Sequence, residues 1–309
     1  MTTAYISHPD CIKHDMGEGH AESPQRVTAV HEALTSSGLI EKLDSYQANL
    51  VTQEQLGRVH DQRYVDKIFA TSPKEGRVAL DPDTSMNPFS LRAAQLAAGA
   101  VVQACDMVME GKADNAFCNV RPPGHHAEHN RAMGFCIFNS IAVGAAHAIK
   151  HHNLSRVAVL DFDVHHGNGT EDIFEDNDKV LLCQTYQSPF YPYTGCDSID
   201  GHIINAALPA GMDSELFRMS IEELWLPQLH QFKPEMLFIS AGFDAHEDDP
   251  LAQCKLHEDD YAWVTKILLN LAQQYCQGRV VSSLEGGYNL SALGKSALAH
   301  VEQLVKAHA

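Results

Sequence analysis

The sequence is poor in basic residues and has no long apolar run. It carries 22 Lys and Arg against 40 Asp and Glu over 309 residues, a formal charge of -18, and the basic side chains form no cluster. Because nucleic acids are polyanions, this charge balance argues against binding to them. The longest apolar stretch, residues 141–149, is far shorter than the ~20 residues of a membrane span. We therefore expect neither nucleic acid nor a membrane as a partner.

Paired cysteines and a secretory signal are also missing. The eight cysteines are scattered without a Cys-x-x-Cys pair, which is typical of reduced thiols in a chain of this length. The first residues lack the basic and apolar regions of a signal peptide. We expect a cytoplasmic protein with neither a disulfide scaffold nor a structural zinc knuckle.

What is present is the composition of a folded protein, with 44% hydrophobic and 20% charged residues. No repeat, low-complexity tract or linker rich in Pro, Gly or Ser marks a boundary, so residues 1–309 are interpreted as a single domain.

Short apolar or β-branched runs alternate with longer segments of helical spacing. The runs predict strands at residues 115–120, 156–163, 179–185, 235–241 and 279–284. The longer segments predict helices at residues 24–37, 89–111, 139–152, 214–231 and 259–277. This alternation is typical of an α/β fold, a parallel sheet with helices on both faces. Ligands in such folds bind beyond the carboxyl ends of the strands, so candidate residues should follow the strands.

Two adjacent imidazoles follow the first of these strands. The sequence Arg-Pro-Pro-Gly-His-His, ending in His125 and His126, reads as a stiff turn at the end of the sheet. For each histidine considered alone, a solvated loop position is the ordinary alternative.

Ligand-type residues follow the next strand at a spacing of two. If the strand continues, Asp161, Asp163 and His165 share one face, while Phe162 and Val164 pack on the other. Carboxylates are costly in a buried place without a cation or hydrogen-bond partners, and a divalent metal meets that need. A helix-capping turn is the alternative.

A third carboxylate, Asp244, follows the strand at residues 235–241. With Asp163 and His165 it completes a set of three protein ligands that leaves one position open, as in catalytic rather than structural zinc sites. Such a metal activates water and polarises a carbonyl, so the site suits hydrolysis of an amide or ester.

The remaining candidates supply proton transfer and charge stabilisation around that metal. One imidazole of the His125–His126 pair can act as base and then acid, with Asp161 and Asn168 orienting the pair. Tyr288 follows Gly286-Gly287 after the last strand and can donate to an oxyanion. The alternative for Tyr288 is a ring packed beneath a loop.

Together these motifs resemble the zinc-dependent histone deacetylase family, in the branch of bacterial histone deacetylase-like amidohydrolases and acetylpolyamine amidohydrolases. The matching segments, which extend over nearly the whole chain, are residues 19–26, 121–126, 134–136, 161–170, 241–244, 249–251 and 285–288. The resemblance implies a three-layer arginase-like fold with a central, mostly parallel sheet of eight strands. It also implies removal of an acetyl group from the amine of a lysine or a polyamine.

The resemblance further assigns roles to the catalytic candidates. Asp163, His165 and Asp244 are similar to the ligands of one zinc ion. His126 is similar to the general base and acid, and His125 with Asp161 to its electrostatic partner. Tyr288 looks like the residue that polarises the acyl carbonyl together with zinc.

Substrate contacts are implied in the same way. Phe135 and Tyr191 are similar to aromatic walls of a tunnel for the alkyl chain, and Gly134 to a backbone carbonyl that binds the substrate N–H. Leu251 stands where the mammalian polyamine deacetylase has glutamate, so one device for selecting a distant cationic amine is absent. Arg26 is similar to an arginine that lines an internal cavity behind the metal.

Two departures from the family pattern affect the expectations. Asn168 stands where some members carry an aspartate, which agrees with the class II-like branch. Gln184 and Tyr186 stand where relatives often have Ser and His, and the serine commonly contributes to a potassium site. Potassium near Asp161 and His165 is therefore a less secure expectation than zinc.

The leading hypothesis is a zinc amidohydrolase that deacylates acyl-lysine in proteins or peptides. An acetylpolyamine deacetylase is the alternative within the enzyme class, and a non-catalytic acyl-lysine binding module is the alternative outside it. A homo-oligomer is compatible with the sequence. His147, His151 and His152 have no partners that the sequence identifies, and surface or capping positions are expected for them.

Overall fold

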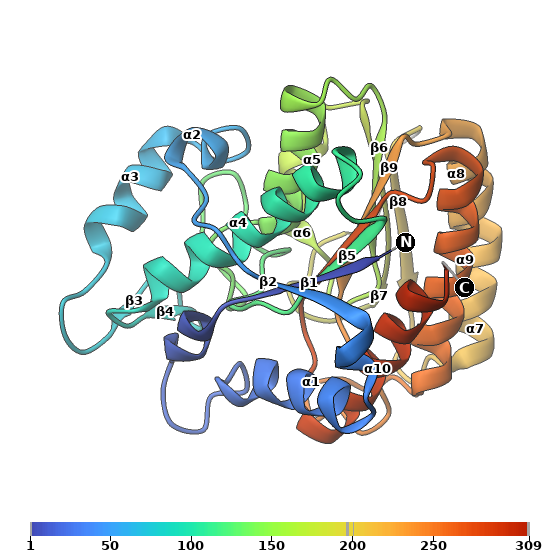
Figure 1. Cartoon of the computed structure of the whole chain (residues 1–309). Helices are drawn as coiled ribbons and strands as arrows, with labels where there is room; N and C mark the ends of the chain where they lie inside the picture. The colour runs from blue at the N-terminus through green and yellow to red at the C-terminus, as the bar shows by residue number, and fades with distance from the viewer. Residues whose placement is uncertain (1, 196–197, 200, 308–309) are drawn as a thin grey trace.

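An eight-stranded sheet forms the centre of the protein in the computed structural model, which describes residues 2–195, 198–199 and 201–307 (Figure 1). The strand order is β2-β1-β5-β10-β9-β6-β7-β8, and all neighbouring strands are parallel. The strands are β1 (Thr3–Ser7), β2 (Leu43–Gln47), β5 (Asn115–Cys118), β6 (Val157–Asp161), β7 (Val180–Gln187), β8 (Ile203–Leu208), β9 (Met236–Ala241) and β10 (Val280–Leu284). A separate antiparallel pair is formed by β3 (Val78–Ala79) and β4 (Ser85–Met86).

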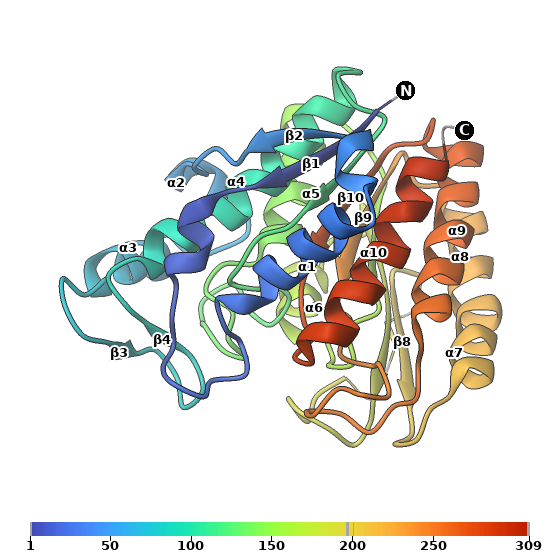
Figure 2. The same cartoon turned by 60° about the horizontal axis from the view of Figure 1, so that its bottom comes forward.

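Helices cover both faces of this sheet, as Figure 2 shows. The helices are α1 (Gln25–Ser36), α2 (Gln53–Leu56), α3 (Gln62–Thr71), α4 (Ser90–Met109), α5 (Ser140–His151), α6 (Asn168–Phe174), α7 (Ser214–Ser220), α8 (Leu226–Phe232), α9 (Glu258–Tyr275) and α10 (Leu290–Lys306). The short helical turns are η1 (Pro9–Lys13), η2 (Leu39–Lys42) and the π-turn η3 (Ile221–Trp225). One apolar core joins α4 and α5 to the sheet, and a second joins α1, α9 and α10 to the opposite face. The predicted three-layer α/β fold with an eight-stranded parallel sheet is confirmed.

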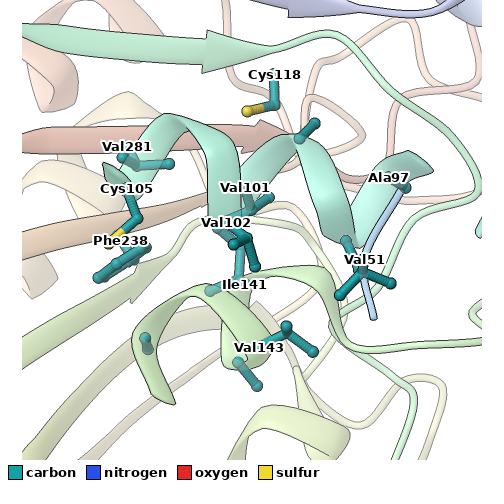
Figure 3. Packing of buried hydrophobic residues seen from close by; sticks show 14 of the residues in the cluster. Val51, Ala97, Val101, Val102, Cys105, Cys118, Ile141, Val143, Phe238 and Val281 are labelled. Atoms are coloured by element: carbon teal, nitrogen blue, oxygen red, sulfur yellow. The ribbon is translucent and has the colours of Figure 1, made fainter. Parts of the chain in front are cut away.

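The core beneath α4 and α5 is tightly packed. Figure 3 shows Val101 and Cys105 of α4 close to Ile141 of α5 and to the strands that carry Cys118 and Val281. All five of these side chains are fully buried. Parallel strands buried on both faces consist of nearly continuous apolar residues, which is why the sequence predicted β5, β6, β7, β9 and β10.

Three strands of the central sheet (β1, β2 and β8), the β3–β4 pair and four helices (α2, α3, α6 and α10) escaped the sequence prediction. The strands β2 and β8 are the two edges of the sheet, and four of the five residues of β2 are exposed, so β2 has no apolar run to reveal it. The buried residues Ala4, Tyr5 and Ile6 of β1 were an available signal. A signal for α10 was present, because Asn289 caps it by accepting hydrogen bonds from the N–H groups of Ser291 and Ala292.

The seven cysteines that the structure describes are free and buried, and Cys196 lies outside the described residues. Among the described residues, no helix combines the length and apolarity that crossing a bilayer demands.

Candidate active site

The candidate metal ligands meet at the carboxyl ends of β6 and β9. Asp163 and His165 lie in the loop after β6, and Asp244 lies in the loop after β9, its register partner in the sheet. All three are buried, and one ligand atom from each lies within 4.8 Å of the others. His165 Nδ1 is 2.9 Å from Asp163 Oδ1 and 3.2 Å from Asp244 Oδ2.

The predicted continuation of the strand to Asp163 is wrong, because β6 ends at Asp161. Beyond it, the backbone N–H of Asp163 donates to Asp161 Oδ1 at 3.0 Å, and the N–H of His165 donates to Asp163 Oδ1 at 2.9 Å. Local hydrogen bonds of this kind, in which an Asp side chain accepts from the backbone N–H two residues later, replace the strand by turns. Asp161 therefore points toward His125, while Asp163 and His165 form the ligand cluster with Asp244.

These three residues fit a bound cation. Asp244 Oδ2 is buried and makes no well-directed hydrogen bond within the described part of the chain, although His165 Nδ1 lies 3.2 Å away. Burial disfavours a charged imidazole, but the nearby carboxylates of Asp163 and Asp244 outweigh it and raise the pKa of His165 to about 10. The carboxylates thus create a negative potential that a divalent cation would neutralise, and two carboxylates with one imidazole are suitable zinc ligands.

Close approach of backbone to these carboxylates requires glycine at position 286. A Cβ atom there would lie 2.0 Å from Asp244 Oδ2 and 2.5 Å from Asp163 Oδ2. The N–H of Gly286 instead donates to Asp163 Oδ2 at 2.8 Å. The turn after β10 therefore both makes room for the cluster and fixes one of its carboxylates.

The histidine pair lies in the loop after β5, and both side chains are buried. His126 Nδ1 is 2.7 Å from Asn168 Oδ1, and His125 Nδ1 is 3.0 Å from Asp161 Oδ2. The amide of Asn168 is oriented by a second bond, because its Nδ2 donates to Glu128 Oε1 at 2.8 Å. Both orienting residues predicted from the sequence thus reach their histidines.

The two imidazoles differ in charge preference. Burial lowers the pKa of His126 well below its ordinary value, and the neighbouring imidazoles of His125 and His165 lower it further. For His125, burial is outweighed by the carboxylates of Asp163 and Asp161, which raise its pKa well above the ordinary value. The pair therefore places a neutral imidazole beside one that favours a positive charge.

Tyr288 is held at the same edge of the sheet. Its backbone N–H donates to Asp249 Oδ2 at 2.7 Å, and the guanidinium carbon of Arg26 lies 5.0 Å from the centre of its ring. Arg26 Nε also donates to the carbonyl of Gly287 at 2.7 Å, so it supports the turn that carries the tyrosine. Burial raises the pKa of Tyr288 well above its ordinary value, against the charge of Arg26. The phenol is therefore a neutral hydrogen-bond donor.

A pocket of about 220 Å³ opens onto these groups. It is lined by Asp83, His126, Gly134, Phe135, His165, Phe190, Tyr191, Leu251 and Tyr288. The four residues that the sequence predicted to contact substrate, at positions 134, 135, 191 and 251, all line it.

Two pocket residues escaped the sequence analysis. The ring of Phe190 stacks on His165 with centroids 5.2 Å apart, and Asp83 Oδ1 accepts a hydrogen bond from the N–H of Gly134 at 3.1 Å. The position of Phe190 directly before Tyr191 was an available signal. Asp83 belongs to a loop far from the other motifs, and no local pattern marks it.

Comparison with known proteins gives one consistent result. A family model described as "Histone deacetylase domain" matches residues 20–304. A histone deacetylase-like amidohydrolase of Pseudomonas aeruginosa is 38% identical over 93% of this chain and 77% of its own length. A probable deacetylase of Archaeoglobus fulgidus is 35% identical over 94% of this chain and 82% of its own length. The crystal structure of the HDA15 HD domain superposes with a TM-score of 0.92 at 34% identity, over 99% of this chain and 88% of that one.

Proposed function

The chain belongs to the histone deacetylase family, and from that premise we propose that it removes acetyl or related acyl groups from the side-chain amine of acyl-lysine in proteins or peptides. The family and its named relatives support the coarser statement, a hydrolytic deacetylase that acts on acetylated substrates. The observation that carries the finer proposal is the convergence of a metal-ligand set, a histidine pair and a tyrosine on one narrow pocket.

Asp163, His165 and Asp244 would hold one zinc ion. Zinc bound there would supply Lewis-acid activation of water and of the acyl carbonyl. The partnerless Asp244 Oδ2 and the negative potential at His165 support this assignment. Potassium near Asp161 and His165 stays a prediction.

His126 is proposed as the general base and acid. Asn168 Oδ1 can only accept, so the proton of His126 resides on Nδ1 and the lone pair on Nε2 is available. His126 also lines the pocket, where Nε2 can take a proton from the attacking water and return it to the leaving amine nitrogen.

His125 is proposed as the electrostatic partner. Its Nδ1 bonds to Asp161 Oδ2, and its Nε2 lies 3.8 Å from Asp163 Oδ1, so two carboxylates stabilise positive charge on this ring. A charged His125 with ring centroid 4.1 Å from that of His126 opposes protonation of His126 and so helps to return the proton to the leaving group.

Tyr288 is proposed as the oxyanion donor. Tyr288 belongs to the pocket lining, and hydrogen bonds of the Arg26 and Asp249 side chains to the backbone of residues 287 and 288 hold its turn in place. A donor fixed before the reaction stabilises the negative charge that develops on the carbonyl oxygen without a cost of reorganisation.

The pocket walls suit an alkyl chain. Phe135 and Tyr191 supply aromatic surface, and apolar Leu251 lies at the same pocket. The carbonyl of Gly134 is proposed to accept the substrate N–H; the thiol of Cys136 lies 3.3 Å from this oxygen. We propose that residues 1–309 act as one catalytic domain.

A turnover panel tests this function. Acetate release would be measured from acetyl-lysine peptides, acetylputrescine and acetylspermidine, with metal analysis of the same sample. We expect one zinc per chain and the highest kcat/KM on acyl-lysine peptides. A higher kcat/KM on the acetylated polyamines would replace acyl-lysine by polyamine as the substrate, and zinc binding without acetate release would identify a binding module.

A further inference from the structure

A second cluster of ligand-type side chains lies outside the pocket, where α4 and α5 end. Asp106 belongs to the last turn of α4, His151 ends α5, His147 lies one turn before it, and His152 follows that helix directly. The expected surface or capping position is wrong for His147, whereas His151 is exposed. His147 is buried, and both His147 and His152 bond to Asp106.

The donor atoms of this cluster are close together. Asp106 Oδ1 is 2.7 Å from His147 Nε2 and 2.8 Å from His152 Nε2. The ring of His151 stacks on that of His147 with centroids 4.8 Å apart. One ligand atom from each of the four residues lies within 4.8 Å of the others, as in the candidate catalytic centre.

Helix geometry explains this convergence. His147 and His151 are four residues apart and so lie on one face of α5, the spacing with which helical histidine pairs bind zinc. The carboxyl ends of α4 and α5 meet here, and unpaired carbonyls give each end a partial negative charge that favours a cation.

The scaffold is held in place by the packing of α4 on α5. A Cβ atom at Gly144 would lie 2.4 Å from Val101 Cγ1, so glycine allows the two helices to approach closely. The carboxylate of Asp106 lies between the imidazoles of His147 and His152 and contacts both.

We propose that Asp106, His147, His151 and His152 bind a divalent transition-metal ion at a second site. Three imidazoles and one carboxylate favour ions such as Zn²⁺ or Ni²⁺ over Mg²⁺ or Ca²⁺, which prefer oxygen ligands. His151 is exposed and His152 half-buried, so the ion can enter from solvent.

Arg58 limits the affinity of this site. Its Nη1 lies 2.6 Å from His147 Nδ1 and donates to it, which leaves the proton of His147 on Nε2, directed at Asp106. Coordination through Nε2 moves that proton to Nδ1, and Arg58 must then turn away. Its second anchor, Glu54, is exposed, so this rotation breaks only a surface ion pair.

The test is metal stoichiometry of the untagged protein that already carries its catalytic metal. Dialysis against micromolar Zn²⁺ or Ni²⁺, followed by metal analysis and calorimetric titration, should give one further equivalent per chain. The His151→Gln/His152→Gln double variant should lose at least about 100-fold in affinity for that equivalent, since even supporting groups cost 10- to 100-fold. His230→Gln, at an exposed histidine elsewhere, should keep it.

Opposite results overturn the proposal. A wild-type protein that takes up no further equivalent, or a double variant that retains it, would leave Asp106 as a hydrogen-bond partner only. Arg58→Met tests the coordination of His147, because removing the guanidinium should tighten binding. Unchanged or weaker binding in that variant would exclude His147 Nε2 as a ligand.

Discussion

Two clusters of aspartate and histidine occur in this protein, one at the carboxyl edge of the sheet and one at the carboxyl ends of α4 and α5. In each, one ligand atom per residue lies within 4.8 Å of the others. They differ in surroundings. Asp163, His165 and Asp244 are all buried and border a pocket with a histidine pair and a tyrosine, whereas the helical cluster borders Arg58 and solvent.

The comparison separates metal binding from catalysis. Close donor atoms are enough to hold an ion, and both clusters have them. Hydrolysis also needs a base with a free lone pair, an oxyanion donor and a channel for substrate, and only the sheet-edge cluster has these groups around it. Variants of the sheet-edge cluster should therefore reduce activity, whereas variants of the helical cluster should leave it unchanged.

The largest effect is expected for Asp244→Asn. Loss of a negative ligand should remove the catalytic metal and reduce kcat/KM by more than about 10³-fold, beyond the cost of one oxyanion donor. Metal content and acetate release would be measured together. Asp248→Asn, at an exposed neighbour, should change neither, and full activity of Asp244→Asn would remove Asp244 from the metal centre.

His126→Ala should come next, with a loss of about 10³-fold in turnover, because the other imidazole that lines the pocket, His165, belongs to the proposed metal-ligand set. His125→Ala should be less damaging, since it removes charge stabilisation rather than proton transfer. The pH–rate profiles of both variants check this order. A more damaged His125 variant would reverse the two roles.

Tyr288→Phe should reduce turnover about 10²-fold while the metal stays bound, as expected for one lost oxyanion donor. Kinetics and metal analysis of the same preparation would measure this. Tyr193→Phe is a matched control, because the residue is 79% exposed. Near-normal turnover of Tyr288→Phe would leave the tyrosine with only a packing role.

The smallest effect on deacetylation is expected for His151→Gln/His152→Gln. Neither residue lines the pocket, so kcat/KM should be unchanged even though the second metal equivalent is lost. If activity and the second metal equivalent were lost together, the two clusters would be coupled, and the helical cluster would not be independent of catalysis.

The sequence correctly predicted the features that local patterns encode, namely the buried strands and the position of the candidate site residues after them. The central strands are buried on both faces, so their apolar runs revealed the parallel sheet, and the sheet located the candidate residues at its carboxyl edge. Prediction was less successful where the backbone leaves regular structure, as at Asp163, where backbone N–H groups donate hydrogen bonds to Asp side chains and β6 ends early.

Contacts between distant segments were beyond the reach of local patterns. Asp83 enters the pocket by bonding to Gly134, and Asp106 meets His147 across 41 residues. No periodicity in the sequence records either contact, because the packing of separate elements creates both.

The sequence by itself determined which ligand-type and catalytic residues are present, their order along the chain and the edge of the sheet at which they gather. These are local properties, because they follow from strand periodicity and from the position of each loop. Only the tertiary structure decided the contacts that no motif links, such as those of Asp106 with the helical histidines and of Glu128 with Asn168. The physical reason is that a hydrogen bond depends on positions within a few tenths of an ångström, and packing of whole strands and helices sets those positions.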